Sequence, residues 1–248
     1  MSHPIALGFG RAAASYDAHS APQRHAAARL AELIVAEALP ARPRVLEIGC
    51  GTGHLTAQLW RRVASADYCC SDIAPAMVAA CRTGLPGLNY LVMDGERPAV
   101  AGPFDLVCAN LAAQWFRDLP AALANLAALL APGGLLAIST LGAESFREWR
   151  AAHAALGLRA GTQAFPSVAT LRAAFPAGSL AIDEEIYVDR ADAALDLPRR
   201  LRAIGAATPV PGHRPLAAGQ LRRVLRALGP QPALTYQLFY ARFRQATA

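Results

Sequence analysis

The chain has 248 residues, of which 54% are hydrophobic and 17% charged, and these values exclude a disordered protein. This length allows one α/β domain with a subdomain, or at most two small domains. The net charge of +6 is unevenly distributed, because residues 197–248 contain nine arginines and neither Asp nor Glu. This basic segment indicates an acidic partner or substrate, but a solvated helix face combined with biased coding is an equally good interpretation.

Helical and extended patterns alternate through the first part of the chain. A helix is predicted at residues 23–38, and the apolar strand 44–48 leads into a glycine cluster. The alternation continues with helices at 54–62, 75–82 and 119–130, strands at 68–71, 88–93, 104–109 and 135–140, and a turn at 132–134. Apolar strands alternating with helices are typical of a parallel sheet that is covered on both faces.

The order changes after residue 140. Helices are predicted at 145–156, 167–174, 192–204 and 220–228, and strands at 182–188 and 234–243. We expect the substrate-specific additions in the region between the fifth and the last strand.

The cysteines and the apolar stretches indicate where the protein works. The five cysteines are odd in number and no pair has metal-ligand spacing, so we predict no metal site and a reducing compartment (Cys50, Cys69, Cys70, Cys81 and Cys108). The first ten residues lack the features of a signal peptide, and prolines and glycines interrupt the long uncharged stretch 119–143. We therefore expect a soluble, cytoplasmic protein.

A glycine-rich loop follows the first predicted strand and precedes a helix. Gly49, Gly51 and Gly53 permit positive φ angles and allow a ligand to lie against bare backbone. The G-x-G-x-G spacing differs from the G-x-G-x-x-G of dinucleotide sites. Glu47, just before the loop, would repel a pyrophosphate, so the loop favours a cofactor with a cationic amino-acid end and no phosphate.

Polar residues stand at the ends of the next three predicted strands. Asp72 is placed to bind the two hydroxyls of a ribose, Asp94 to accept from an adenine amino group, and Asn110 to lie beside the reacting centre. Any one of them alone is more simply a solvated loop residue. All three together, after a glycine loop, predict a ligand at the carboxyl edge of the sheet.

This combination resembles the class I S-adenosylmethionine-dependent methyltransferases over residues 44–141. The resemblance implies a doubly wound, mainly parallel seven-stranded α/β sheet with a helical lid, and S-adenosylmethionine as methyl donor, with S-adenosylhomocysteine as its product. It also implies a set of cofactor-binding residues (Glu47, Gly49, Cys50, Gly51, Gly53, Asp72, Ile73, Met77, Asp94, Gly95, Asn110 and Leu111). The implied organisation is an N-terminal helical lid segment (1–40), an S-adenosylmethionine-binding core (41–143), a substrate lid with insertions and the sixth strand (144–233), and a last strand that completes the sheet (234–248).

Further blocks indicate a narrower family. The segments 9–17, 110–115, 139–146, 201–206 and 234–240 resemble the malonyl-acyl-carrier-protein O-methyltransferases of biotin synthesis, the BioC family. The resemblance implies methylation of the free carboxylate of malonyl-acyl carrier protein or malonyl-coenzyme A, giving the methyl ester that primes pimeloyl synthesis. The segment after the fourth strand lacks the proline pair typical of methyltransferases that act on bases.

A carboxylate acceptor explains why no catalytic base is evident. A carboxyl group with a pKa of about 4 is already ionised at neutral pH, so the enzyme needs to align and desolvate it. We predict that Tyr16 closes over cofactor and substrate, that Gln114 walls the methyl site, and that Arg202 holds the carboxylate. A packed tyrosine and an exposed helix arginine are the alternative interpretations of Tyr16 and Arg202.

The basic segment then has a candidate partner. Acyl carrier proteins are acidic, and five arginines are candidates for docking one on a monomeric enzyme (Arg199, Arg200, Arg222, Arg223 and Arg226). No nucleic acid or membrane is expected as a partner. Three alternatives remain: a trans-aconitate-like carboxylate methyltransferase, an RNA methyltransferase suggested by the basic segment, and a methyltransferase-like assembly factor.

Overall fold

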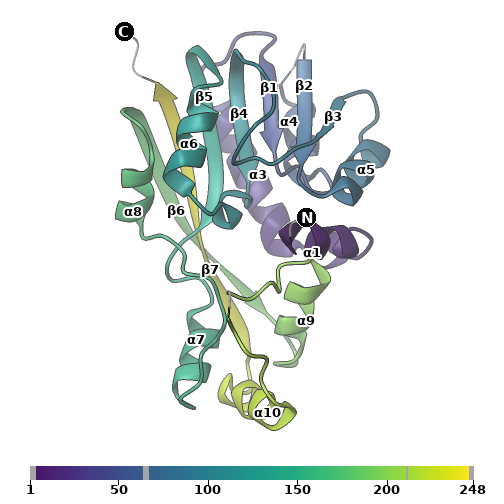
Figure 1. Ribbon diagram of the computed structural model, residues 1–248, viewed down its shortest axis with the longest axis vertical. Helices are drawn as coiled ribbons and strands as arrows, with labels where there is room; N and C mark the ends of the chain where they lie inside the picture. The colour runs from purple at the N-terminus through teal and green to yellow at the C-terminus, as the bar shows by residue number, and fades with distance from the viewer. Residues whose placement is uncertain (1–3, 64–66, 211, 246–248) are drawn as a thin grey trace.

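The structure, a computed structural model that describes residues 4–63, 67–210 and 212–245, is built on one twisted sheet (Figure 1). In the described residues the sheet has seven strands in the order β3-β2-β1-β4-β5-β7-β6. The first five pair in parallel, whereas β7 is antiparallel to both β5 and β6. The strands are β1 (Arg44–Ile48), β2 (Asp67–Asp72), β3 (Asn89–Val92), β4 (Phe104–Asn110), β5 (Leu130–Leu141), β6 (Gly178–Arg190) and β7 (Ala233–Gln245). The predicted doubly wound α/β fold is confirmed.

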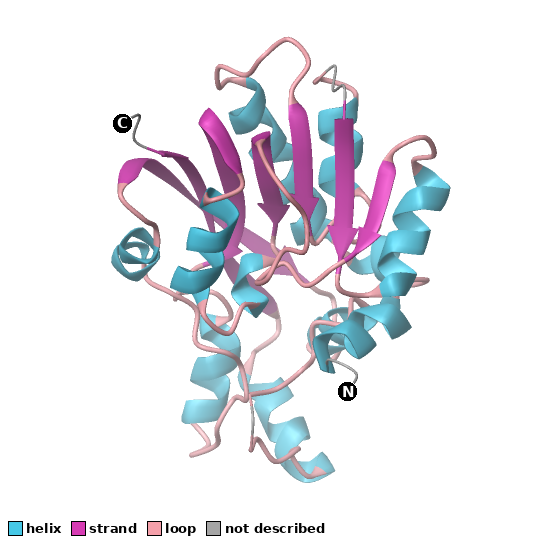
Figure 2. Cartoon of the chain, turned by 45° about the horizontal axis from the view of Figure 1, so that its top comes forward, coloured by secondary structure: helices cyan, strands magenta, loops and turns pink. Residues whose placement is uncertain are grey.

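Helices cover both faces of the sheet because the buried strands are apolar on both sides (Figure 2). On one face α3 (Ala21–Val35), α4 (His54–Trp60) and α5 (Pro75–Gly84) pack on the core that contains Val45 and Leu106. On the other face α6 (Leu119–Ala127) and α8 (Val168–Ala174) pack on the core that contains Leu46 and Val107. Among the described residues, no helix is both long enough and apolar enough to cross a membrane.

The remaining helices gather at one end of the sheet. They are α1 (Pro4–Ala12), α2 (Tyr16–His19), α7 (Arg147–Ala154), α9 (Asp196–Ala203) and α10 (Ala218–Ala227). Figure 1 shows β6 and β7 running on beyond the other strands toward α7, α9 and α10, while α1 lies between these helices and the sheet. The carboxyl ends of the parallel strands point toward this end, which is where ligands of such sheets bind.

Two details differ from the prediction. Residues 1–40 were expected to form a lid, but α3 belongs to the core, with Leu30 and Ile34 fully buried against the sheet, and only α1 and α2 lie over the site. The predicted turn at 132–134 is instead an irregularity inside β5, where the register shifts between Phe104 and Leu106 of the paired strand β4. The extra residues fit there because Gly133 adopts a φ of 74°.

Candidate active site

The loop after β1 brings bare backbone to the edge of the sheet. Gly49 and Gly51 have φ values of 68° and 55°, a region that a residue with a side chain rarely adopts. A Cβ on Gly49 would lie 2.6 Å from the Cβ of Ala112, so this glycine is required by the close approach of the next loop. A Cβ on Gly51 would meet nothing within 4 Å, so the backbone of Gly51 faces open space.

Asp72, at the end of β2, is held by this loop. One carboxylate oxygen accepts a hydrogen bond from the Gly51 N–H at 2.9 Å, and the other accepts one from the Ala74 N–H at 2.8 Å. Burial raises the pKa of Asp72, and these backbone hydrogen bonds oppose the rise. Each oxygen keeps a further lone pair, which fits the pair of hydroxyls of a ribose.

A pocket opens beside Asp72 and is lined by nine of the predicted cofactor residues (Gly49, Gly51, Asp72, Ile73, Met77, Asp94, Gly95, Asn110 and Leu111). Ile73 and Met77 supply an apolar wall, and Asp94 is an exposed acid at the end of β3. Ile5 and Phe9 of α1 form the roof of the pocket. Bare backbone, two acids and an apolar wall match the donor set that a nucleoside needs, so the residues fit the predicted cofactor.

Three other predicted cofactor residues lie outside this pocket. The Glu47 carboxyl is buried on the opposite side of β1, where it accepts hydrogen bonds from Thr56 Oγ1 at 2.8 Å and the Tyr68 hydroxyl at 2.6 Å. Burial raises the pKa of Glu47 to about 8. The structure therefore contradicts the prediction that this carboxylate faces a cationic group of the cofactor. Alternate strand residues face opposite sides, which is why the acid points away from the pocket.

Cys50 and Gly53 also serve the loop rather than the pocket. The Cys50 N–H donates to the Ser71 carbonyl at 2.8 Å, which ties the loop to β2. Gly53 begins α4 with a φ of 100°, and a Cβ there would lie 3.0 Å from Cys81 Sγ. In this structure they shape the loop, and neither lines the cofactor pocket.

A second, larger pocket meets the first at one boundary. Phe9, Tyr16, Leu111 and Trp115 line both. The Phe9 ring packs edge-on against Trp115 with centroids 5.5 Å apart, and it lies 6.5 Å from the Tyr16 ring. We call this group the junction, because it is where the two pockets meet.

The backbone at the junction is strained. Leu111 has a φ of 47°, and its N–H donates to Ser139 Oγ at 3.0 Å. Ser139 in turn donates to the Asn110 side chain at 2.7 Å. The Gln114 amide donates to the Leu111 carbonyl at 2.6 Å. Asn110 and Gln114 are thus both engaged in holding Leu111, which fits a positioning role for Gln114.

Tyr16 is fixed over the glycine loop by its neighbours. Thr52 Oγ1 donates to the Asp17 carboxylate at 2.6 Å, and Ser20 Oγ lies 2.8 Å from His54 Nε2. Burial, followed by the Asp72 and Asp17 charges, raises the pKa of Tyr16, so its hydroxyl stays protonated at neutral pH. Within the residues that the structure describes this hydroxyl has no hydrogen-bond partner, which leaves it free to donate to a ligand.

The second pocket has a volume of about 690 Å³ and lies between α1, α7 and α9. We call it the acyl pocket. Its walls are mostly apolar and aromatic, as in other sites for small molecules (Phe146, Trp149, Phe165 and Tyr236). Among the described residues that line it there is no Asp or Glu, whereas Arg199 and Arg202 are both present. The arrangement therefore favours an acceptor with an apolar or neutral body and a negative charge.

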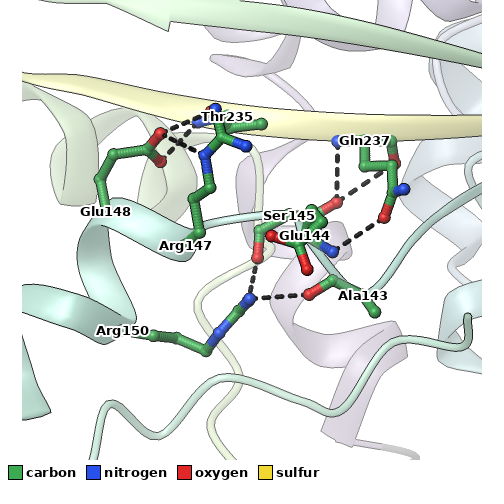
Figure 3. Close-up of polar contacts among 8 residues, drawn as sticks. All are labelled: Ala143, Glu144, Ser145, Arg147, Glu148, Arg150, Thr235 and Gln237. Carbon is green, nitrogen blue, oxygen red and sulfur yellow. Dashed lines mark hydrogen bonds and ion pairs between the residues drawn. The ribbon is translucent and has the colours of Figure 1, made fainter.

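The corner after β5 that carries this wall is anchored to β7 (Figure 3). The Glu148 carboxylate accepts from the Thr235 N–H at 2.9 Å and from its hydroxyl at 2.5 Å. The Arg150 guanidinium donates to the carbonyls of Ala143 and Ser145. These bonds hold the chain on both sides of Phe146.

Phe146 itself adopts a left-handed conformation, with a φ of 60°. Its ring packs edge-on against Tyr236, at a centroid distance of 5.0 Å, and against Phe165, at 5.8 Å. A bulky residue in this region is strained and persists only where the surroundings fix it. No local pattern predicts this conformation, so Phe146 and its aromatic partners were missed as pocket residues.

Comparison with known proteins agrees with this geometry. A family model described as a methyltransferase domain matches residues 22–183. The malonyl-[acyl-carrier protein] O-methyltransferase of Magnetococcus marinus is 42% identical, over 95% of this chain and 90% of its own length. The chain belongs to this methyltransferase family.

The methyltransferase also resembles a bifunctional protein. The biotin biosynthesis bifunctional protein BioCD of Bordetella avium is 51% identical over 97% of this chain, which spans about half (52%) of that protein. Among solved structures, the YcgJ protein of Bacillus subtilis has a TM-score of 0.62 at 15% identity and covers 88% of this chain and 99% of its own, which shows the fold. As a member of its family, the chain is an S-adenosylmethionine-dependent methyltransferase.

The arginines of the methyltransferase that were predicted to bind the acceptor or the carrier protein differ in their exposure and in their ion pairs. Arg202 is exposed at the acyl pocket and has no ion pair within the described part of the chain. Arg200 is bound to Asp189 at 2.6 Å, and Arg199 lies 3.5 Å from Asp196. The three arginines of α10 are exposed (Arg222, Arg223 and Arg226). Within the described residues no cluster of His, Cys, Asp or Glu has the arrangement of a metal site.

Proposed function

We propose that this methyltransferase transfers the methyl group of S-adenosylmethionine to the free carboxylate of malonyl-acyl carrier protein, giving the methyl ester that primes pimeloyl synthesis for biotin. One observation carries the proposal: an aromatic pocket with no acidic lining residue in the described chain holds Arg202 and meets the cofactor pocket at Tyr16. The names of the Magnetococcus and Bordetella relatives support the same acceptor and the same biosynthetic purpose.

The cofactor would lie on the glycine loop, with Asp72 accepting from its ribose and Ile73 and Met77 against its base. When bound, it supplies an electrophilic methyl group on a sulfonium. The acceptor needs no base, because its carboxyl group, with a reference pKa of about 4, is already ionised at neutral pH. What the chain must provide is alignment and exclusion of water.

Two side chains provide the alignment. Arg202 pairs with one carboxylate oxygen, and the protonated Tyr16 hydroxyl at the junction donates to the carboxylate and turns the other oxygen toward the methyl group. Gln114 keeps Leu111 in its strained conformation and so fixes the wall behind the reacting atoms. The aromatic residues of the acyl pocket and Phe9 of the roof exclude water, which strengthens both contacts.

The carrier protein docks on the lid. The exposed arginines of α10, together with Arg199 at the mouth of the acyl pocket, offer positive charge to an acidic partner (Arg222, Arg223 and Arg226). Arg200 contributes less than the sequence suggested, because Asp189 neutralises it. We propose that the enzyme works as a monomer in the cytoplasm, and its free cysteines support a reducing compartment.

Labelled S-adenosylmethionine tests this function. The enzyme is offered malonyl-acyl carrier protein, acetyl-acyl carrier protein and a mixed RNA substrate in separate reactions. We expect base-labile label on the malonyl form only, because only that acyl group carries a carboxylate. Label on the acetyl form or on RNA would overturn the proposed acceptor.

A further inference from the structure

The roof of the cofactor pocket touches the roof of the acyl pocket at a pair of glycines. α1 covers the cofactor pocket with Ile5 and Phe9, and α9 covers the acyl pocket with Arg199 and Arg202. Figure 1 shows α1 lying directly beside the end of α9, although the two helices are far apart in the sequence. The atoms that meet there belong to Gly8 of α1 and to Gly205, just after α9.

The approach is so close that a side chain on Gly205 would force the two backbones apart, and a side chain on Gly8 would crowd the Gly205 carbonyl. A Cβ on Gly8 would lie 3.0 Å from the Gly205 carbonyl oxygen. A Cβ on Gly205 would lie 2.8 Å from the Gly8 carbonyl carbon and oxygen. Gly10, in the same helix as Gly8, differs sharply, because a Cβ there would meet nothing within 4 Å.

Gly205 also sets the end of α9. It has a φ of 77°, and its N–H donates to the Arg202 carbonyl at 3.0 Å, while the Ala206 N–H donates to the Leu201 carbonyl at 2.9 Å. These are the two bonds of a Schellman motif, in which a left-handed glycine terminates a helix. The glycine that touches α1 therefore belongs to the same cap as Arg202.

A hydrogen bond reinforces the contact. Ser15 Oγ donates to the Ala203 carbonyl at 2.8 Å, and Ser15 directly precedes Tyr16 of the junction. The cofactor pocket itself has a volume of only about 80 Å³. Ligand pockets typically measure about 300–1,000 Å³, so the roof formed by α1 lies low over this site in the structure.

We propose that Gly8 and Gly205 are positioning residues that couple α1, the roof of the cofactor pocket, to α9, the roof of the acyl pocket. Closure of α1 over the cofactor then also sets the end of α9 and places Arg202 at the acyl pocket. The glycine contact transmits the closure, since α1 cannot settle on the cofactor without resting on the α9 cap. This inference rests on the proposed function in one respect only, namely that Arg202 binds the acceptor carboxylate.

Hydrogen exchange tests the coupling without any acceptor. The amides of Ile204, Gly205 and Ala206 are hydrogen-bonded in the α9 cap and report its opening. In the wild-type enzyme S-adenosylhomocysteine is expected to slow their exchange about fivefold or more, the lower end of typical couplings between sites. In Gly8→Ala the slowing should fall below about twofold, while the glycine loop at residues 49–56 remains protected by the ligand.

Gly10→Ala is the matched control. Both substitutions raise the helix propensity of α1 by about 1 kcal/mol, but only Gly8→Ala adds an atom at the contact. Gly10→Ala should therefore behave like the wild type. Ser15→Ala adds no atom and breaks the bond to Ala203, so it should weaken the protection of the cap if Gly8→Ala does not fold.

The kinetics provide a second measurement. With S-adenosylmethionine saturating, Gly8→Ala is expected to raise KM for malonyl-acyl carrier protein more than it lowers kcat, because Arg202 is misplaced before the chemical step. Equal cap protection in Gly8→Ala and wild type, no cap protection in wild type, or its loss in Gly10→Ala would each overturn the coupling. A failure of the proposed acceptor would leave the exchange result unchanged, so the two hypotheses are distinguishable.

Discussion

Removal of one hydroxyl group tests the catalytic role proposed for Tyr16. The Tyr16 hydroxyl has no hydrogen-bond partner within the described residues and lies at the junction of the two pockets. Tyr16→Phe is therefore expected to change the free energy of unfolding by less than about 0.5 kcal/mol. It removes the hydrogen bond that we propose to the acceptor carboxylate, and bonds to charged groups contribute about 1.5–3 kcal/mol. The value of kcat/KM should fall by roughly 10- to 150-fold, at about 1.4 kcal/mol for each factor of ten.

Tyr68→Phe is the matched control. The Tyr68 hydroxyl is buried and donates to the Glu47 carboxyl at 2.6 Å, on the side of β1 that faces away from the pockets. Its loss leaves a buried carboxyl with one partner fewer and is expected to cost about 1–3 kcal/mol of stability. Its effect on kcat/KM should be less than about threefold, since a change on the side of β1 that faces away from the pockets leaves the contacts to the transition state intact.

Denaturant unfolding and steady-state methyl transfer, measured on both variants, check this contrast. The reasoning is refuted if Tyr16→Phe keeps full kcat/KM, or if it loses as much stability as Tyr68→Phe. The first result would make Tyr16 a packing residue of the N-terminal segment. The second would mean that its hydroxyl is bonded within the protein.

Three further predictions concern charge. Because the pKa of Glu47 is raised to about 8 in the folded protein, its contribution to stability is complete below the unfolded value near 4.5 and is lost as pH rises through 8. Urea unfolding at several pH values should therefore show a decline in stability, and Glu47→Gln should flatten that decline by up to about 1.4 kcal/mol per pH unit. Asp72→Asn should weaken S-adenosylhomocysteine binding about 10- to 100-fold in calorimetry, and unchanged affinity would remove Asp72 from the ribose site. Substitution of Arg222, Arg223 and Arg226 by Glu should raise KM for malonyl-acyl carrier protein at least about tenfold at low salt and leave KM for malonyl-coenzyme A unchanged. An equal rise for both acceptors would contradict docking on α10.

The sheet and the cofactor pocket could be predicted from the sequence because their signals are local. The strand β1 was predicted with its observed ends, since an apolar run followed by glycines leaves little choice. Asp72 and Asp94 reach one edge because parallel strands end on the same side of a sheet. Topology then places these strand ends at one edge without any knowledge of packing.

The failures come from side-chain direction and from contacts between distant segments. The position of Glu47 beside the loop was correct, but alternation along β1 turns it toward Tyr68 and into the core. The acyl pocket unites the first helices with α7 and α9, which lie more than a hundred residues further along the chain. The left-handed Phe146 depends on the anchoring of its corner to β7, and no local pattern encodes that bond.

The position of the new methyl group tests the central claim most directly. Malonyl-acyl carrier protein is incubated with the enzyme and S-adenosylmethionine, and the acyl arm is then released and fragmented by tandem mass spectrometry. The account predicts one methyl group on the carboxyl oxygen, removed by mild alkali, with product formation reduced roughly 10- to 150-fold when Arg202→Gln replaces the wild type at the same substrate concentration. A methyl group on carbon or on the carrier polypeptide would contradict it.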